Sequence, residues 1–344
     1  MDGFSLPNKR SDRIVLEANL DYWDTTRFPR LQRIIFDNSL DHTEAMELVK
    51  TREGRVDLVT GLSPLETLRV AQSPFAKVVK ARGSLMSVFG VFNMRKAGSP
   101  WREVRLRQAV NYAINRPDLI RYAAKGNGVL IPALVPVHGY GYDPHLAPYP
   151  FEPSKAWHLL QEAGYPDGFE ITLIAPEDLT VQATVVSKML EQVGFTVTLQ
   201  LLDPVAYNRQ TVLSHLEQPP AHPSWDMAIH VRGDRQNFPV FGIYHQFALD
   251  GAYDWVLEEP ALRQLYEQAL GTVDQDRQQA VIRQMERHTR DQAYFLFLYN
   301  PIQLYAVNKA VDFVPYVTPV LKLDATSLTA QHWSVRKQKA AEQE

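Results

Sequence analysis

The sequence predicts an α/β protein with a sheet that is parallel or mixed. Residues 169–174 (FEITLI) and 195–202 (FTVTLQLL) are strand-like apolar runs, and residues 179–193 between them carry a helical pattern. A helix that connects two strands of this length returns the second strand parallel to the first. Strand and helix patterns recur along all 344 residues, and that length is sufficient for two domains, each with its own core.

The first part of the chain reads mainly as strands. RIVLEA (13–18) alternates apolar and polar residues, which is the pattern of a strand with one buried face. Residues 42–51 carry a helical pattern. Further strands are predicted at residues 31–36, 56–60, 77–81 and 85–94.

Residues 100–120 (PWREVRLRQAVNYAINRPDLI) predict an amphipathic helix that Pro117 ends. Its apolar residues fall on one face, and we expect Arg102, Arg105 and Arg107 around the rest of the surface. This pattern is typical of a helix with one face in a core. A nucleic-acid-reading helix would need a wider basic field, whereas the chain has a net charge of −3.

The second half alternates helices and strands. Residues 126–150, rich in Gly, Pro and Tyr, predict a long ordered loop. A helix is predicted at residues 153–163, where Pro stands at the start and Gly164 follows the end. The remaining predicted elements are a strand at 226–231, helices at 259–270 and 275–291, and two strands around a kink at Pro301 within 294–307.

The composition argues against catalysis, cofactors and metals. The chain has no cysteine, so thiol catalysis and disulfides are excluded. Its ten histidines lack metal-ligand spacing, its serines lack a base pattern, and no Gly-rich phosphate loop occurs. We therefore expect no enzyme, no cofactor and no metal. No apolar run is long enough to span a bilayer, and the first residues lack the apolar core of a secretory leader.

Four segments, in order, carry a family resemblance. They are DRIVLEANLDYW (12–23), FNMRKAGSPWREVRLRQAVNYAINRPDLI (92–120), YPFEPSKAWHLLQEAGYPDGF (149–169) and PIQLYAV (301–307). Together they resemble the family 5 solute-binding proteins of bacterial ABC importers, which bind dipeptides, oligopeptides or nickel. The resemblance implies a two-lobed periplasmic-binding-protein type II-like fold.

The resemblance also implies boundaries. Relatives have a large N-terminal section before the DRIVLEAN strand, so we expect an N-terminally truncated version of the fold. Lobe one would comprise residues 1–82 and 308–344 and would be partial. Lobe two would comprise residues 83–307 with the hinge strands.

The implied function is non-catalytic solute binding, of peptides above all, with an ABC transporter permease as partner. The implied location is the periplasm or the cell surface; without a leader, the cytoplasm stays open. Two alternatives remain: an interaction subunit completed by a partner chain or by a homodimer, and a ligand-sensing regulatory module. No nucleic-acid partner and no membrane-spanning part are expected.

The resemblance places the ligand contact in the loop Arg232-Gly233-Asp234-Arg235. In the peptide binders an aspartate near the position of Asp234 pairs with the α-amino group of the peptide. In this chain two arginines flank that carboxylate, so it could equally be a structural group held by its neighbours. Arg232 and Arg235 suit an anionic ligand group at least as well as an amine. Arg209 and Asn93 are further candidates.

Overall fold

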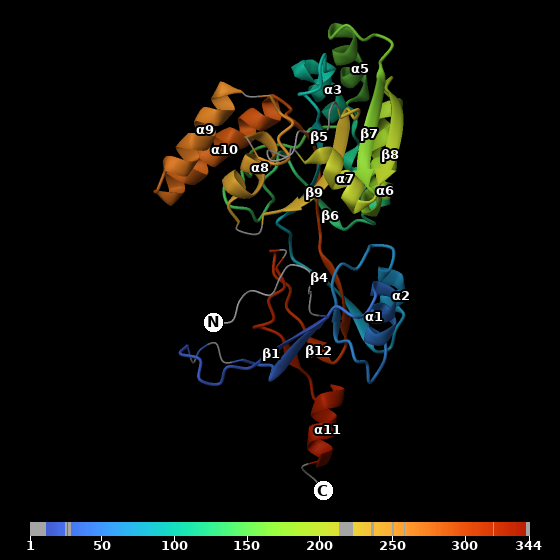
Figure 1. Ribbon diagram of the computed structural model, residues 1–344, viewed down its shortest axis with the longest axis vertical. Coiled ribbons are helices and arrows are strands. Elements are labelled where there is room, and N and C mark those ends of the chain that lie inside the picture. The colour runs from blue at the N-terminus through green and yellow to red at the C-terminus, as the bar shows by residue number, and fades with distance from the viewer. Residues whose placement is uncertain are drawn as a thin grey trace. The chain divides into compact units, whose positions relative to one another are not determined.

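The computed structural model describes residues 12–24, 26, 29–212, 223–234, 237–249, 251–257, 259–318 and 320–341, and of residues 339 and 340 only the backbone. The chain divides into two compact units (Figure 1). Unit 1 comprises Met1–Arg82, Gln303–Tyr316 and Leu321–Glu344, and unit 2 comprises Gly83–Ile302 and Val317–Val320.

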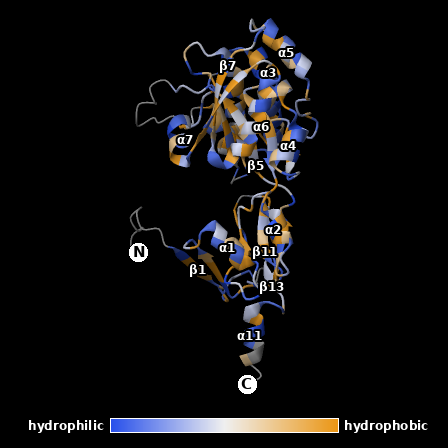
Figure 2. Cartoon of the chain, turned by 90° about the vertical axis from the view of Figure 1, so that its right-hand side faces the viewer, coloured by the Kyte–Doolittle hydropathy of each residue, from blue (hydrophilic) through white to orange (hydrophobic). Residues whose placement is uncertain are grey.

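Unit 2 is built on a mixed sheet of six strands in the order β6-β10-β5-β9-β7-β8. β7 pairs parallel with β8 and β9, and the other neighbours are antiparallel. Figure 2 shows hydrophobic residues along β5 and β7, while the surrounding helices carry both kinds of residue. The strands are β5 (Met86–Phe92), β6 (Gly128–Leu130), β7 (Glu170–Pro176), β8 (Thr196–Leu202), β9 (Met227–Gly233) and β10 (Phe295–Pro301).

The predicted crossover is confirmed: β7 and β8 are parallel and α6 (Thr180–Glu191) connects them. The two strands begin where Gly168 and Gly194 touch. A Cβ atom on Gly168 would lie 1.7 Å from the carbonyl oxygen of Gly194, and both residues have positive φ (68° and 110°). Only glycine allows the strand entries to approach this closely.

The described residues of unit 2 form seven further α-helices. Acidic or amide side chains that precede a helix accept hydrogen bonds from its first-turn N–H groups; these N-caps are Glu103, Asn115, Asp203, Glu259 and Asp274. The helices are α3 (Val104–Ala113), α4 (Arg116–Ala123), α5 (Pro153–Glu162), α7 (Pro204–Thr211), α8 (His245–Ala248), α9 (Pro260–Gly271) and α10 (Gln275–Asp291). The prediction missed α4, α7 and α8, which are short.

Two predictions for residues 100–120 are wrong. The helix α3 ends at Ala113, before Pro117, and Pro117 lies in the first turn of α4, where a missing N–H costs nothing. Arg107 is buried: its Nη1 donates to the carbonyl oxygen of Trp101 at 2.6 Å and its Nη2 to that of Gln292 at 2.7 Å. The arginine is a cross-link between backbone segments, a role that helical periodicity does not reveal.

The long loop at residues 126–150 is held by arginines of α10. Arg287 forms a salt bridge with the buried carboxylate of Asp143 at 2.7 Å. Arg283 and Arg290 donate to the carbonyl oxygens of Tyr142 and Ala147. Side chains of a neighbouring helix thus satisfy backbone groups that no regular element pairs.

Unit 1 contains a three-stranded antiparallel sheet in the order β3-β11-β4. Its core gathers Ala81, Tyr305, Val307, Val311 and Phe313. The two strands predicted around Pro301 are confirmed, because β10 ends at that residue and β11 begins at Leu304. The elements are β3 (Leu58–Val59), β4 (Ala76–Lys80), β11 (Leu304–Asn308), β12 (Val311–Asp312), β13 (Ser327–Leu328), α1 (His42–Val49), α2 (Thr67–Ala71) and α11 (Trp333–Ala341).

Two strands of unit 1 form a separate antiparallel ribbon. β1 (Arg13–Glu17), which is labelled in Figure 1, pairs with β2 (Arg33–Asp37), and Val15 stands opposite Ile35. All five residues of β1 are exposed.

Candidate functional site

The candidate site lies at the end of β9, in the centre of the sheet of unit 2. β9 pairs antiparallel with β5 and parallel with β7. The ladder continues one residue beyond the strand, because the N–H of Asp234 donates to the carbonyl oxygen of Leu85 at 2.9 Å. Since side chains alternate along a strand, His230, Arg232 and Asp234 share one face.

Arg232 is half-buried and lies against an aromatic ring. Its guanidinium carbon is 4.5 Å from the centre of the Tyr253 ring, which is a cation–π contact. Its Nε is buried and has no hydrogen-bond partner in the part of the chain that the structure describes. No carboxylate among those residues forms a salt bridge with it either. The side chain is therefore oriented by stacking, while no carboxylate among the described residues neutralises its charge and its buried Nε–H lacks an acceptor there.

His230 lies two residues before Arg232, inside an aromatic cluster. Its ring stacks on Phe89 and meets Tyr207, Phe247 and Tyr253 edge-on. Burial, and secondarily the positive charge of Arg232, hold the pKa of His230 well below its usual value. The ring is therefore neutral at physiological pH, and its Nε2 has no partner within the described residues.

Asp234 is packed against a π-helix. Only 1% of the residue is exposed, and its Oδ1 lies so near Gly242 that a Cβ atom there would be 2.7 Å away. Gly242 belongs to η4 (Val240–Tyr244), a single π-helical turn that leads into α8. Asn237, with φ of 53°, makes the turn between the strand and this helix. The buried position favours the structural reading of Asp234.

Glu286 of α10 holds the π-helical turn in place through a hydrogen bond. This carboxyl group accepts the O–H of Tyr244 and, at 2.9 Å, the N–H of Val135. Burial raises the pKa of Glu286 to about 7, although its hydrogen bonds act in the opposite direction. One buried acid thus connects η4, α10 and the long loop.

Helix α7 lies over β9, because the O–H of Tyr207 donates to the carbonyl oxygen of Ile229 at 2.6 Å. The O–H of Tyr253 reaches Oδ1 of Asn208, the neighbour of Arg209, at 3.5 Å. Arg209 itself is exposed in the last turn of α7. Tyr253 thereby connects Arg232 with the helix that carries Arg209.

Asn93 does not lie at the candidate site around Arg232 and Asp234. The N–H of Asn93 donates to the carbonyl oxygen of Asp226, at the start of β9, whereas Asp234 follows its end. At roughly 3.3 Å per residue the two lie about 26 Å apart along the strand. The buried amide of Asn93 also donates to the carbonyl oxygen of Trp225 and accepts the N–H of Lys96. Gly233 ends β9, and Arg235 lies outside the described residues.

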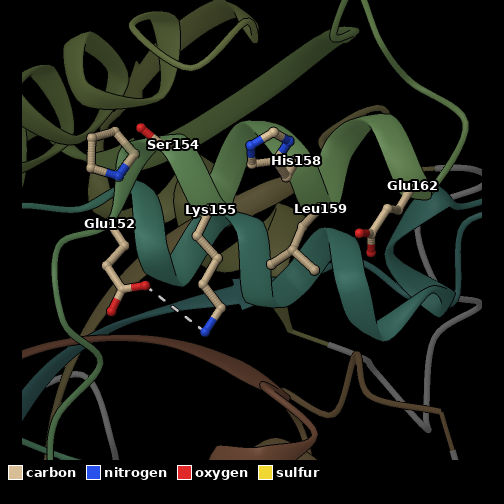
Figure 3. A pocket seen from close by; sticks show the side chains of 7 residues that line it. Glu152, Ser154, Lys155, His158, Leu159 and Glu162 are labelled. Carbon is tan, nitrogen blue, oxygen red and sulfur yellow. Dashed lines mark ion pairs between the residues drawn. The ribbon is translucent and has the colours of Figure 1, made fainter.

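A groove of about 460 Å³ lies along α5 and contains none of these residues (Figure 3). Its basic group, Lys155, has partners: Nζ donates to the O–H of Tyr112 at 2.9 Å and lies 3.9 Å from Glu152. Lys155 is thus already paired with groups of the protein at this end of the groove.

The described residues contain neither a candidate metal site nor a membrane-spanning helix. No three histidine or acidic side chains gather where they could hold a metal ion. No helix among them combines the length and apolar character needed to cross a membrane.

His230 and Tyr253 were missed by the sequence analysis. The alternation His230, Arg232, Asp234 was a usable signal, since three polar residues on one face of an otherwise apolar strand are unusual. Tyr253 had no such signal, because it reaches the site from a separate loop.

Comparison with known sequences gives one family. Residues 7–251 match the family described as bacterial extracellular solute-binding proteins, family 5. Heme-binding protein A of Haemophilus influenzae is 31% identical over 162 residues, which are 47% of this chain and 28% of that protein. Glutathione-binding protein GsiB of Pectobacterium atrosepticum is 28% identical over 197 residues, 56% of this chain and 37% of that protein. The matched part thus spans about a third of these relatives.

Solved structures share the fold. A periplasmic binding protein, DppA of Helicobacter pylori, in complex with the peptide STSA, has a TM-score of 0.75 at 21% identity, covering 93% of this chain and 61% of that one. A dipeptide-binding protein of Pseudoalteromonas in complex with Met-Leu has a TM-score of 0.72 at 18% identity, with 93% and 63% covered. The predicted periplasmic-binding-protein type II-like fold is therefore confirmed.

Proposed function

The chain belongs to the bacterial extracellular solute-binding proteins of family 5, and from that premise we propose that it binds a small peptide-like solute without altering it chemically, for delivery to an ABC importer. The importer's permease is then its partner, and the periplasm or cell surface its place of action. The proposal rests on family membership for the role and on Arg232 for the ligand.

Arg232 is the group we assign to the ligand. Its stacked guanidinium keeps a fixed orientation, and its buried Nε lacks a partner among the described residues. A planar guanidinium matches a carboxylate in shape and charge, and a partly buried pair of this kind is stronger than an exposed one. The ligand group that fits Arg232 is therefore a carboxylate, such as the C-terminus of a peptide.

The relatives agree with a ligand that carries carboxylates. One is named for glutathione, a small peptide with free carboxylates, and two solved neighbours hold peptides. A free carboxyl terminus is the feature that such ligands share.

The other candidates receive supporting roles. Asp234 fixes the loop against Gly242, and Gly233 is the last residue of β9, directly after Arg232. Arg209, exposed on the helix that Tyr253 reaches, supplies a second positive charge. Arg235 remains a candidate from the sequence alone. An amine contact at Asp234 is the less favoured assignment, because the carboxylate is packed away from solvent.

Isothermal calorimetry with a mixture of dipeptides and tripeptides, and separately with glutathione, tests the role. We expect saturable binding, and unchanged peptides by mass spectrometry after incubation. Heat without saturation, or hydrolysis of the peptides, would contradict the proposal.

A further inference from the structure

Two buried nitrogen atoms without hydrogen-bond partners lie on the same face of β9. They are Nε2 of His230 and Nε of Arg232, and neither has a partner among the described residues. The two residues are two positions apart on a strand, so their side chains share a face. A buried polar group without a partner is destabilising. Two such groups at neighbouring positions on one face point to a single group that satisfies both.

The covalent structure of the two side chains gives both nitrogen atoms a similar height above the sheet. In histidine Nε2, and in arginine Nε, is the third atom beyond Cβ. Residues two apart on a strand are roughly 6.6 Å apart, and a carboxylate that accepts a hydrogen bond of about 2.8 Å at each oxygen spans a comparable distance. Both side chains also contact the Tyr253 ring, Arg232 through its guanidinium at 4.5 Å and His230 edge-on, with ring centres 5.7 Å apart. One carboxylate can therefore reach both nitrogen atoms.

The imidazole of His230 is suited to be a neutral donor. Burial, and secondarily the positive charge of Arg232, hold the pKa of His230 well below its usual value, so the ring carries one proton. With that proton on Nε2, the ring donates to an oxygen without adding a second positive charge. The single negative charge of a carboxylate is then balanced by Arg232 alone, which lowers the cost of burying the group.

The surroundings of His230 would suit a phenylalanine better. The ring stacks on Phe89 and meets Tyr207, Phe247 and Tyr253 edge-on. A phenyl ring would keep these contacts and would bury no unpaired nitrogen. The nitrogen therefore contributes to something other than packing.

We propose that His230 is a specificity-determining residue, whose Nε2–H donates to one oxygen of the ligand carboxylate while Arg232 binds the other oxygen. This inference rests on the proposed function and extends it by a second donor. Exposure increases along β9, from 2% at His230 to the half-buried Arg232 and Gly233. The carboxylate therefore enters from the end of the strand, and His230 forms the inner wall. A terminal amide has only one oxygen, so it leaves one of the two donors without an acceptor.

His230→Phe separates binding from folding. Its urea midpoint should equal or exceed that of wild type, because the variant removes a buried unpaired nitrogen. By calorimetry it should lose about 10-fold in affinity for tripeptides with a free carboxyl terminus and keep its affinity for the amidated peptides. His230→Gln places an amide nitrogen at the same third position beyond Cβ, so it should retain more of the affinity for the free carboxylate than His230→Phe does.

Tyr207→Phe is the matched control. The O–H of Tyr207 donates to the carbonyl oxygen of Ile229 at 2.6 Å, and its ring also meets His230. Loss of this O–H should lower the urea midpoint and leave the ratio of affinities for free and amidated peptides as in wild type. The opposite responses of His230→Phe and Tyr207→Phe distinguish a ligand contact from a structural one.

A double variant tests whether the two donors share one carboxylate. In His230→Phe/Arg232→Gln the loss of binding free energy should be smaller than the sum of the two single losses, because both side chains contact the same group. Additive losses, or an unchanged ratio in His230→Phe when wild type prefers the free carboxylate, would overturn the inference and leave the proposed function standing. Water alone would then satisfy Nε2. A wild type that binds neither kind of peptide would overturn both.

Discussion

Arg232 lies with its guanidinium carbon 4.5 Å from the centre of the Tyr253 ring, at the end of the central strand of unit 2. The tyrosine comes from a loop about twenty residues further along the chain, and its hydroxyl group reaches Asn208 of α7. Stacking fixes the planar group without consuming its charge. A salt bridge within the protein would both orient the guanidinium and neutralise its charge. Stacking on the tyrosine ring orients it and leaves the charge in place.

Glu286 should make the protein less stable as the pH rises. Its folded-state pKa of about 7 lies above the ordinary value of 4.5, so the folded protein holds this proton more tightly than the unfolded chain does. Its contribution is fully present below pH 4.5 and is lost as the pH rises through 7, a change of roughly 3 kcal/mol. Urea unfolding at pH 5 and pH 8 measures it.

Glu286→Gln should remove this part of the pH dependence, because the amide does not titrate. Glu267→Gln, on the exposed side of α9, is the control and should behave as wild type. An identical pH dependence in wild type and Glu286→Gln would show that the acid does not titrate between pH 5 and pH 8.

Arg116 should be essential for the stability of unit 2. It is fully buried, and burial lowers its pKa to about 9, yet its guanidinium donates to four carbonyl oxygens and to the side chain of Asn111. Arg116→Met leaves these buried acceptors without donors, which should cost roughly 3 kcal/mol or more of unfolding free energy. Arg121→Met, exposed on the same helix, should change it by less than about 0.5 kcal/mol. Similar urea midpoints for the two variants would contradict this role.

Unit 2 should fold by itself. Its hydrophobic core extends from Val88 to Tyr299 and takes no residue from unit 1. A fragment that spans Gly83–Ile302 should therefore unfold cooperatively in urea, with coincident transitions by fluorescence and circular dichroism. A broad transition that differs between the two probes would mean that this core depends on other parts of the chain.

Much of the fold could be predicted because local patterns and long-range packing agree. The segments 169–174 and 195–202 are strands on apolar pattern alone, and the helix between them leaves a parallel pairing as the available topology. Pro301 interrupts an apolar run, and β10 ends at this residue before β11 begins at Leu304.

The sequence prediction failed where contacts between distant segments of the chain determine the position of a side chain. Arg107 was expected on the solvent-facing side of its helix, but its guanidinium is buried and donates to the carbonyl oxygen of Trp101, just before α3. Pro117 was read as the end of a helix, although proline is equally suited to the first turn of the next one. At the site, Asn93 is separated from Asp234 by the length of β9, which depends on strand pairing that no motif reveals.

The central claim, that Arg232 binds a carboxylate of a peptide-like solute, is tested most directly by calorimetry with matched peptides. Tripeptides with a free carboxyl terminus and the same peptides with an amidated terminus are titrated into wild type, Arg232→Gln and the exposed control Arg121→Gln. The account predicts that wild type and the control prefer the free carboxylate, and that Arg232→Gln loses at least about 30-fold in affinity for it while its affinity for the amidated peptides is unchanged. Equal binding of free and amidated peptides by wild type, or undiminished binding by Arg232→Gln, would contradict it.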